Sequence, residues 1–262
     1  MESLSIDMIL SAFLVFVRVA ALVMTAPFFS TQAFPRQIKI YFSIVTSVML
    51  FWAIPAEGAY ISASSDTLFI VTAIFMEVLV GVALGLIGQL VFAGLEMAGM
   101  LISLNSALSF ASMVDTMTQK QSAIVSNLFM MIAVLVFLSI DGDKIYISAL
   151  AKSFELIPVT EAEIHLAGPY MLEIATYLFV IGVQIATPFM IVIFLLDVSL
   201  AIFARIMPQA NMMFIALPIK IGVGIALLML SIPYLPTAFE MMFQHLYDFI
   251  AEMLGVLAPD IN

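Results

Sequence analysis

The chain has 262 residues, of which 64% are hydrophobic and only 10% are charged, and its mean hydropathy is +1.21. Soluble globular domains are about half apolar and roughly a quarter charged, so this composition predicts an integral membrane protein. The net charge of −10 argues against nucleic-acid binding, which needs clustered Lys and Arg, and the lack of cysteine excludes disulfides and thiolate chemistry.

Six apolar segments are long enough to form transmembrane helices, which need about 20 mainly apolar residues. They are residues 8–25, 40–56, 68–98, 123–140, 174–204 and 212–233. The third and fifth are longer than one bilayer crossing, and Pro188 predicts a kink in the fifth. Apolar segments of this length require helices, so the predicted fold is an all-α membrane protein with bent helices.

A seventh segment, residues 237–258, has a different pattern. Glu240, Gln244, Asp248 and Glu252 follow one another at a spacing of four residues on an otherwise Met-, Phe- and Leu-rich stretch. This spacing puts the polar side chains on one face of a helix. We therefore expect this helix to lie on a surface or to pack on partners, and not to span the lipid.

Five charged residues lie inside the apolar segments or at their edges: Arg18, Glu77, Glu96, Asp197 and Lys220. A charge at the bilayer centre costs at least about 2.5–3.5 kcal/mol on insertion scales. One interpretation is a conduction path or a proton relay. The other is that these groups pair with each other, with partner subunits or with water in a polar lumen. Both interpretations require the charged helices to face protein or water.

Small residues follow the charge in the third segment. Gly81, Gly85 and Gly88 come shortly after Glu77, and a GxxxG spacing lets two helix backbones approach closely. These glycines are predicted to lie at a helix-packing surface.

Residues 98–123 are too polar for lipid and too apolar for an ordinary solvated loop. Irregular backbone at membrane depth is tolerated where it is buried in protein or lines a cavity, and the alternative is a linker outside the membrane. Met100, Met113 and Met117 have flexible side chains that are suited to sealing a pore.

The sequence predicts no enzyme, cofactor or metal site. His165 and His245 are the only histidines, and no HExxH, GxSxG or phosphate-binding glycine loop is present. Asp141-Gly142-Asp143 resembles the start of a calcium loop, but the further ligands do not follow. The Asp-Gly dipeptide in it is typical of a turn, which is the preferred interpretation.

Several separated patterns occur together along the chain. The N-terminal features are Arg18, Pro27-Phe28, Pro35-Arg36 and Lys39, followed by Glu77, Gly81 and Gly85. The central ones are Ala98-Gly99, Ser109-Phe110-Ala111, Asp115, Asp141-Gly142, Ser153-Phe154 and Pro158. The most specific stretch has Ala204-Arg205, Pro208-Gln209, Asn211, Phe214, Pro218 and Lys220. In this order, these patterns resemble the flagellar biosynthetic protein FliR family, whose relatives in virulence secretion are the T-type export subunits. Ala107 stands where the family usually has glycine, and alanine resists a positive φ.

The resemblance implies a subunit of a protein export gate. In the family, one copy joins the P and Q subunits in a helical, cone-shaped hetero-oligomer of bent hydrophobic hairpins, through which unfolded flagellar proteins leave the cytoplasm. Residues 1–262 would form a single export-gate domain, with a P-like part at 1–170 and a Q-like part at 171–262. The implied location is the bacterial inner membrane within the flagellar basal body, with part of the assembly projecting beyond the lipid plane.

The resemblance also assigns expected roles and partners. Ser106, Phe110, Met113 and Met117 would belong to the plug that closes the pore. Arg205 and Lys220 would pair with acids on P and Q, or with Glu77 and Asp197 in this chain, and Arg18 would belong to the same set of assembly charges. Pro208 and Pro218 would redirect the chain between two helices of a hairpin. Further partners are the A and B export-apparatus subunits, unfolded substrates and lipid.

Two other hypotheses remain open on the residues alone. A small proton-coupled transporter would use Glu77 and Asp197 as proton carriers, but it should have repeat symmetry with paired broken helices, and the sequence has no obvious repeat. A passive membrane scaffold without a pore is the third.

Overall fold

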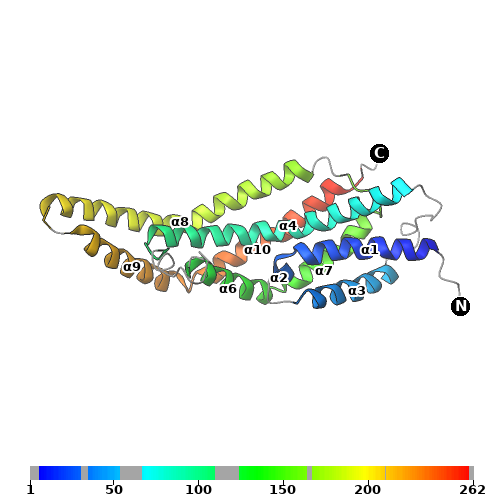
Figure 1. The fold of residues 1–262 in the computed structure, drawn as a ribbon, viewed down its shortest axis with the longest axis horizontal. Helices are drawn as coiled ribbons and strands as arrows, with labels where there is room; N and C mark the ends of the chain where they lie inside the picture. Colours follow the sequence, from blue (N-terminus) through cyan, green and yellow to red (C-terminus); the bar gives the residue numbers. More distant parts are fainter. Residues whose placement is uncertain are drawn as a thin grey trace. The chain divides into compact units, whose positions relative to one another are not determined.

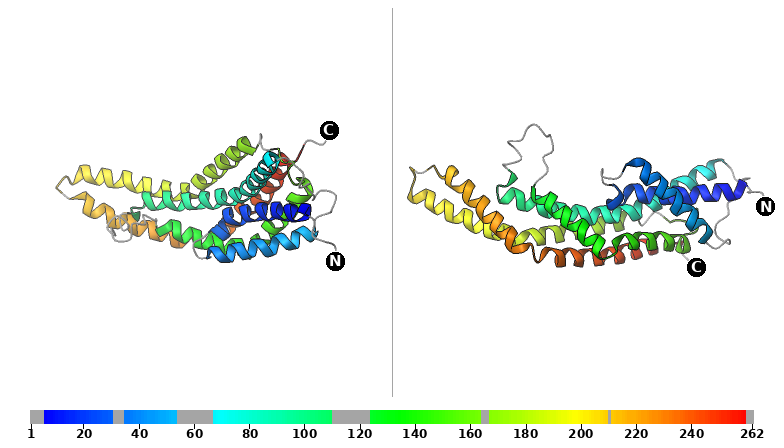
Figure 2. Two further views of the ribbon diagram at one scale, coloured as in Figure 1. Left: turned by 45° about the vertical axis from the view of Figure 1, so that its right-hand side comes forward. Right: turned by 90° about the horizontal axis from the view of Figure 1, so that it is seen from below.

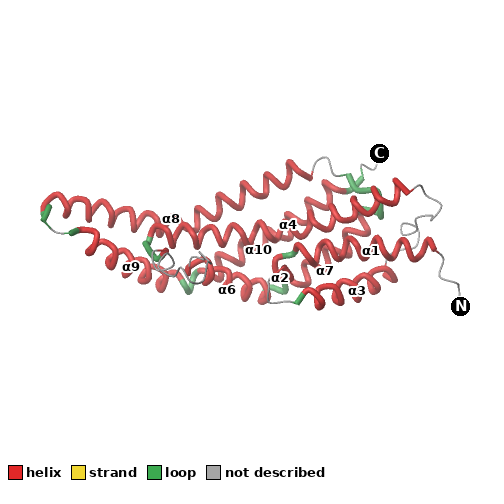
Figure 3. The backbone as a smooth tube through the Cα atoms, in the orientation of Figure 1, coloured by secondary structure: helices red, strands yellow, loops and turns green. Residues whose placement is uncertain are grey.

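The computed structural model describes residues 6–30, 35–53, 67–109, 124–163, 167–209 and 211–259. The regular structure of these residues is helical (Figures 1 and 3). The helices are α1 (Ile6–Thr25), α2 (Pro27–Ser30), α3 (Arg36–Ala53), α4 (Thr67–Asn105), α6 (Ile124–Ser139), α7 (Gly142–Leu156), α8 (Ala167–Ile206), α9 (Met212–Ser231) and α10 (Leu235–Leu257). The predicted all-α membrane fold is confirmed.

The number of helices that can cross a membrane is smaller than the six segments predicted from hydropathy. Within the described residues, four helices are long and apolar enough: Asp7–Thr25, Thr67–Asn105, Ala167–Ile206 and Phe214–Ser231. A fifth crossing is possible if α6 and α7, which meet at an angle of 64°, form one broken span. Helix α3 is not among them, and Arg36, Gln37 and Lys39 in its first turn make it less apolar than those four.

The chain divides into two compact units that interleave along the sequence. Unit 1 comprises residues 1–90, 141–175 and 243–262, and unit 2 comprises 91–140 and 176–242. Helices α4, α8 and α10 each contribute residues to both units. This division is based on contacts within the chain, whereas the predicted P-like and Q-like parts concern ancestry and stay a prediction.

In unit 1, α1 packs tightly against α4 along the predicted glycine surface. A Cβ atom added to Gly81 would collide with the carbonyl oxygen of Arg18, and one added to Gly85 would collide with Thr25. Gly88 leaves room in the same way for Pro27 and Tyr146. The three glycines therefore allow a helix contact so close that backbone meets backbone.

Helix α3 packs against α1 (Figures 1 and 2), and the residues that it buries are polar. Lys39, Ser43 and Ser47, spaced four residues apart, are its buried residues. The opposite face is apolar and exposed, and Trp52 at its end is 75% exposed. A soluble protein has the reverse arrangement, so this helix is built for apolar surroundings.

In unit 2, small residues again permit close helix contacts. Gly99 of α4 lies against the backbone of Ser126 in α6, and the Ser126 hydroxyl donates to the carbonyl oxygen of Glu96 at 3.0 Å. Gly94 and Gly182 bring α4 and α8 together. Edge-to-face ring pairs join α6 to its neighbours, Phe137 to Phe92 and Phe129 to Phe239, with centroids 5.8 and 5.4 Å apart.

Helix α10 has the two faces that its sequence predicts. Its polar stripe is exposed, at Glu240, Gln244, Asp248 and Glu252. Its opposite face is buried, at Phe239, Phe243, Leu246, Ile250, Met253 and Leu257. Helix α10 is not one of the candidate membrane spans of the described residues, and its place on a surface or against partners stays a prediction.

Helices α6 and α7 meet at the predicted Asp-Gly turn. Asp141 has a φ of 57°, in the left-handed region that Asp tolerates better than most residues, and Gly142 begins α7. Lys144 pairs with the carboxylate of Asp141 at 2.9 Å. Helix α7 itself was not predicted, since it lies outside the seven segments identified from the sequence.

Candidate functional site

Arg18 is the largest fully buried side chain of the described residues, and it joins three helices of unit 1. Its Nε and Nη2 atoms donate to the two carboxylate oxygens of Glu77 on α4, at 2.5 and 3.0 Å. Its Nη1 donates to the carbonyl oxygens of Ser153 and Ile157, each at 3.0 Å. The guanidinium also lies 4.3 Å from the ring centre of Phe154.

The carbonyl partners of Arg18 lie at the C-terminal end of α7, where helices have unpaired carbonyl groups and a partial negative charge. A planar guanidinium can donate two hydrogen bonds to one carboxylate and still donate to these carbonyls. Lysine, with a single ammonium group, cannot do both. Arg18 therefore acts as the C-terminal cap of α7 from another helix.

Glu77 holds the turn that follows α7. Its Oε1 accepts a hydrogen bond from the backbone N–H of Thr160 at 3.1 Å. Thr160 has a φ of 80°, which is a strained conformation for a β-branched residue. The carboxylate thus fixes α1 through Arg18 and a strained turn through Thr160. These contacts describe a structural lock, with both charged groups fully engaged.

A second ion pair lies on the α8–α9 hairpin in unit 2. The ammonium group of Lys220 is 2.6 Å from a carboxylate oxygen of Asp197. The Lys220 side chain is 24% exposed and that of Asp197 is 44% exposed. The expectation that Lys220 could pair with Asp197 within the chain agrees with this geometry.

Arg205 has a different environment. It lies exposed in the last turn of α8, and it forms no ion pair with any residue that the structure describes. Glu77 and Asp197, its expected partners within the chain, are bound to Arg18 and Lys220. Neither of its expected partners within the chain therefore pairs with Arg205 among the described residues.

The two hairpin prolines have different positions. Pro208 lies in the turn between α8 and α9, as expected. Pro218 lies inside α9, so its assignment to the turn is wrong. Its fixed φ is compatible with a helix, but proline removes one backbone hydrogen bond there and its ring crowds the preceding turn. Pro188 likewise lies inside α8, which is drawn bent along its length in Figure 1.

Of the four expected plug residues, only Ser106 is described; Phe110, Met113 and Met117 lie outside the described residues. Ser106 is buried, and its hydroxyl donates to the carbonyl oxygen of Ile102. Its Cβ packs on Gly224 of α9, a helix position where no larger residue would fit. Ala107 adopts a φ of 59°, so this chain takes the left-handed conformation without the family's glycine.

The sequence reasoning missed the residues that complete the Arg18 centre. Ser153, Ile157 and Thr160 lie outside the predicted apolar segments, and they act mainly through backbone atoms, which leave no chemical signature in a sequence. The Ser153-Phe154 and Pro158 pattern was the available signal. No cluster of metal-binding side chains occurs in the described part of the chain.

The fold and these contacts define a helical membrane protein whose buried charges lock its helices together. The chain belongs to the family of bacterial export proteins, family 1, whose model matches residues 9–246. It is 30% identical over 248 residues to the flagellar biosynthetic protein FliR of Pectobacterium carotovorum subsp. carotovorum, covering 93% of this chain and 92% of that protein.

Two further relatives carry the same name. The flagellar biosynthetic protein FliR of Aquifex aeolicus is 31% identical over 250 residues, which are 95% of this chain and 92% of that protein. The one of Escherichia coli is 26% identical over 241 residues, or 92% of this chain and 91% of that protein. The resemblance seen in the sequence is confirmed over nearly the whole chain.

Proposed function

We propose that this flagellar export subunit is a structural and gating part of the channel through which unfolded flagellar proteins leave the cytoplasm. The family and the names of the relatives support a role in flagellar export. The proposal includes assembly with the P and Q subunits, contacts with the A and B subunits, and a location in the inner membrane within the basal body.

The exposed apolar surface of the α8–α9 hairpin carries this proposal. Only 6% of the residues in the apolar stretch of α9 are buried. Large side chains are exposed along both helices, including Phe194, Phe203, Ile206, Phe214 and Met229. Soluble monomers rarely expose such a continuous patch, so lipid or neighbouring subunits must cover it.

The charges on the same hairpin favour neighbouring subunits over lipid for part of this surface. Arg205 is exposed at the end of α8, and an unpaired charge surrounded by acyl chains costs at least about 2.5–3.5 kcal/mol. An acidic group on a partner would remove this cost. The family's membership in an export apparatus makes a P or Q subunit the expected source.

A gate is also supported over the transporter alternative. Glu77 was one of the two proposed proton carriers, but its carboxylate is buried, bound twice by Arg18 and once by Thr160. A proton carrier has to exchange its partners and reach water. The charge is instead fixed in place, and no relative or family match points to a transporter.

Charge reversal at Arg205 tests the assembly proposal. The chain would be co-expressed with the P and Q subunits and purified through an affinity tag, and the amount of each recovered subunit would be measured. Arg205→Glu should reduce their recovery strongly, whereas the matched reversal Lys152→Glu, at an exposed lysine of α7, should leave it unchanged. Unchanged recovery with Arg205→Glu, or a stable purified monomer that never binds P or Q, would contradict the proposal.

The plug role stays a proposal for residues 106–120. It is supported by the family resemblance and by the polar, Met-containing composition of that stretch. Deleting these residues should raise ion leakage through membranes that contain the assembled gate. An unchanged leak would remove the assignment.

A further inference from the structure

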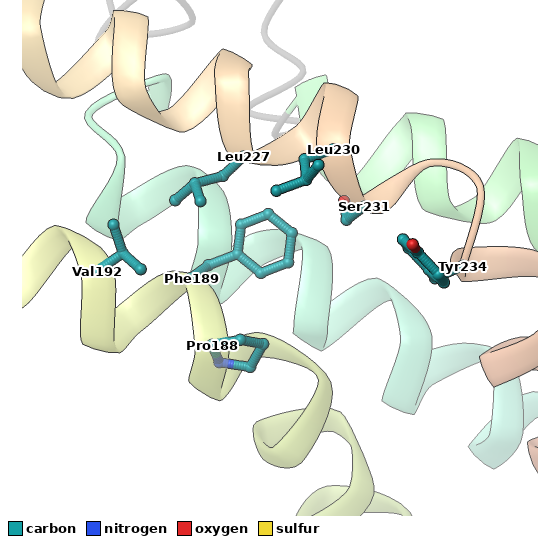
Figure 4. Close-up of a pocket in the computed structure, with 7 residues that line it drawn as sticks. All are labelled: Pro188, Phe189, Val192, Leu227, Leu230, Ser231 and Tyr234. Atoms are coloured by element: carbon teal, nitrogen blue, oxygen red, sulfur yellow. The ribbon is translucent and has the colours of Figure 1, made fainter.

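A cavity of about 270 Å³ lies between α8 and α9 in unit 2 (Figure 4). Its lining residues are Pro188, Phe189, Val192, Leu227, Leu230, Ser231 and Tyr234. Both helices are candidate membrane spans, so the cavity opens on a surface that lies among lipid or apolar neighbours. None of the contacts described above for the Arg18 lock or for Arg205 uses it.

Pro188 of α8 lies at one side of this cavity. Pro188 has no N–H to donate back along α8, and the helix is bent in this part of unit 2. The next residue, Phe189, is buried with its ring pointing into the space between the helices (Figure 4). The bend and the ring therefore keep α8 and the end of α9 apart at a point where two straight helices would close up.

The lining has an apolar body and one polar end. Val192 and Leu227 lie at one side of the cavity, whereas the hydroxyl groups of Ser231 and Tyr234 lie at the other (Figure 4). The Ser231 hydroxyl already donates to the carbonyl oxygen of Leu228. Tyr234 is 72% exposed and stands where α9 ends, which is typical of a tyrosine at the membrane–water interface.

The dimensions and polarity select the occupant. Apolar groups suit the cavity better than water, since Ser231 and Tyr234 are the only lining residues with polar side chains and both lie at one end. At about 30 Å³ for each small group, the cavity holds roughly nine, the size of a stretch of methylene groups. A phospholipid acyl chain has this composition, and its ester end would meet the polar end of the cavity.

We propose that this cavity is a binding site for one acyl chain of a membrane phospholipid, with the ester region next to Tyr234. The bound chain fills the gap that Pro188 opens between α8 and α9. The lipid then becomes a fixed part of the hairpin and not only a solvent for it. The proposed function places neighbouring subunits on other parts of the same α8–α9 hairpin, so the experiment has to distinguish a lipid from a partner side chain in this cavity.

Photochemical labelling tests the site directly. The full chain, together with its co-purified subunits, would be reconstituted in vesicles of phosphatidylethanolamine and phosphatidylglycerol that carry a diazirine in the middle of one acyl chain. After illumination, peptide mass spectrometry would locate the lipid adducts. We expect more adducts on Phe189 and Leu227, the less exposed residues of the lining, than on the outward-facing Phe194 and Met229.

A filling substitution and its neighbour give the matched comparison. Val192→Phe should occupy the cavity and lower the adduct yield on Leu227 and Leu230 by about tenfold, the loss expected for two buried methylene groups. Ile191→Phe adds the same ring at an exposed position outside the lining and should leave the yield unchanged.

Two results would overturn the proposal. Adducts spread evenly over the exposed apolar residues of α8 and α9 would mean that the cavity holds no particular chain. Adducts on the lining in the isolated chain, but not in the assembled complex, would mean that a partner side chain fills it. The wild-type mapping alone decides this point, even if Val192→Phe fails to fold.

Discussion

At the level of single residues, the charge of Arg18 is satisfied by three separate kinds of group: a carboxylate, helix-end carbonyls and an aromatic face. Burying two charges is expensive, and the attraction between them offsets this cost only when the geometry is good and the remaining donors are bonded. Both conditions hold here, so the pair depends on each member being present.

Single and double substitutions of this pair should therefore differ. Arg18→Met or Glu77→Met alone should lower the free energy of unfolding by about 3–5 kcal/mol, because each leaves a buried charge without its partner. The double variant should lose less than either single variant. Thermal and denaturant unfolding in detergent would measure this. As a control, Lys144→Met breaks a pair whose two side chains are 68% and 65% exposed and should change little.

Ala107 provides a second prediction at this scale. A left-handed conformation costs an alanine about 1–2 kcal/mol. Ala107→Gly removes that cost, but it also loses a buried methyl group, about 0.8 kcal/mol, and adds about 0.4–1 kcal/mol of backbone entropy in the unfolded state. The terms nearly cancel, so stability should change by less than about 1 kcal/mol.

Ala133→Gly is the matched comparison for that substitution. Ala133 is equally buried, but it lies inside α6, where glycine is also about 1 kcal/mol less favourable than alanine. This variant should lose about 2 kcal/mol. Equal losses for Ala107→Gly and Ala133→Gly, measured by unfolding in the same detergent, would contradict the left-handed assignment.

At the level of elements, hydropathy alone predicted the five most apolar helices to within a few residues, apart from the longer ends of α4 and α8. It missed α7 because Asp143, Lys144, Lys152 and Glu155 make that stretch look like a solvated loop. The buried face of α7, with Tyr146, Leu150 and Phe154 at a spacing of four, was the signal that charge obscured.

The partners of charged residues were harder to predict than the helices. The sequence identified Arg18, Glu77, Asp197 and Lys220 as an unusual set, but many pairings of them were open. The choice depends on which helix faces pack together. Here the glycines of α4 decide it, since their close contact with α1 brings Glu77 to Arg18.

The glycine contact between α1 and α4 should be sensitive to one added carbon atom. Gly81→Ala would put a methyl group against the carbonyl oxygen of Arg18, and overpacking of this kind typically costs about 1–3 kcal/mol. Gly255→Ala, in an open part of α10 of the same unit, should instead stabilise by up to about 1 kcal/mol through helix propensity. Opposite shifts in the thermal unfolding midpoint are expected, and a shift of the same sign in both would contradict the packing.

At the level of the whole molecule, the described surface has two kinds of exposed helix face. Helices α3, α8 and α9 expose large apolar side chains, whereas α10 exposes a polar stripe. Composition correctly predicted a membrane protein, but it could not assign these faces, because burial depends on the packing of helices that are far apart in the sequence.

A carboxylate placed on each kind of face should separate them. Met229→Glu, at a 67% exposed position of α9, should cost at least about 2.5–3.5 kcal/mol if its surroundings are apolar. Gln244→Glu on the polar stripe of α10 should be tolerated. The amount of chain that resists alkaline extraction from membranes would report the difference, and equal retention of both variants would show that α9 faces water.

The lock at Arg18 also has a consequence for the order in which the protein is made. Glu77 follows Arg18 by 59 residues, and the carbonyl of Ile157 follows it by 139. At about 5–20 residues per second, a ribosome needs roughly 3–12 seconds to deliver the carboxylate and longer to deliver the cap. During that interval the nascent α1 carries Arg18 without its carboxylate partner. We therefore expect α1 to stay at the membrane surface, or Arg18 to pair with a lipid phosphate, until α4 has been synthesised.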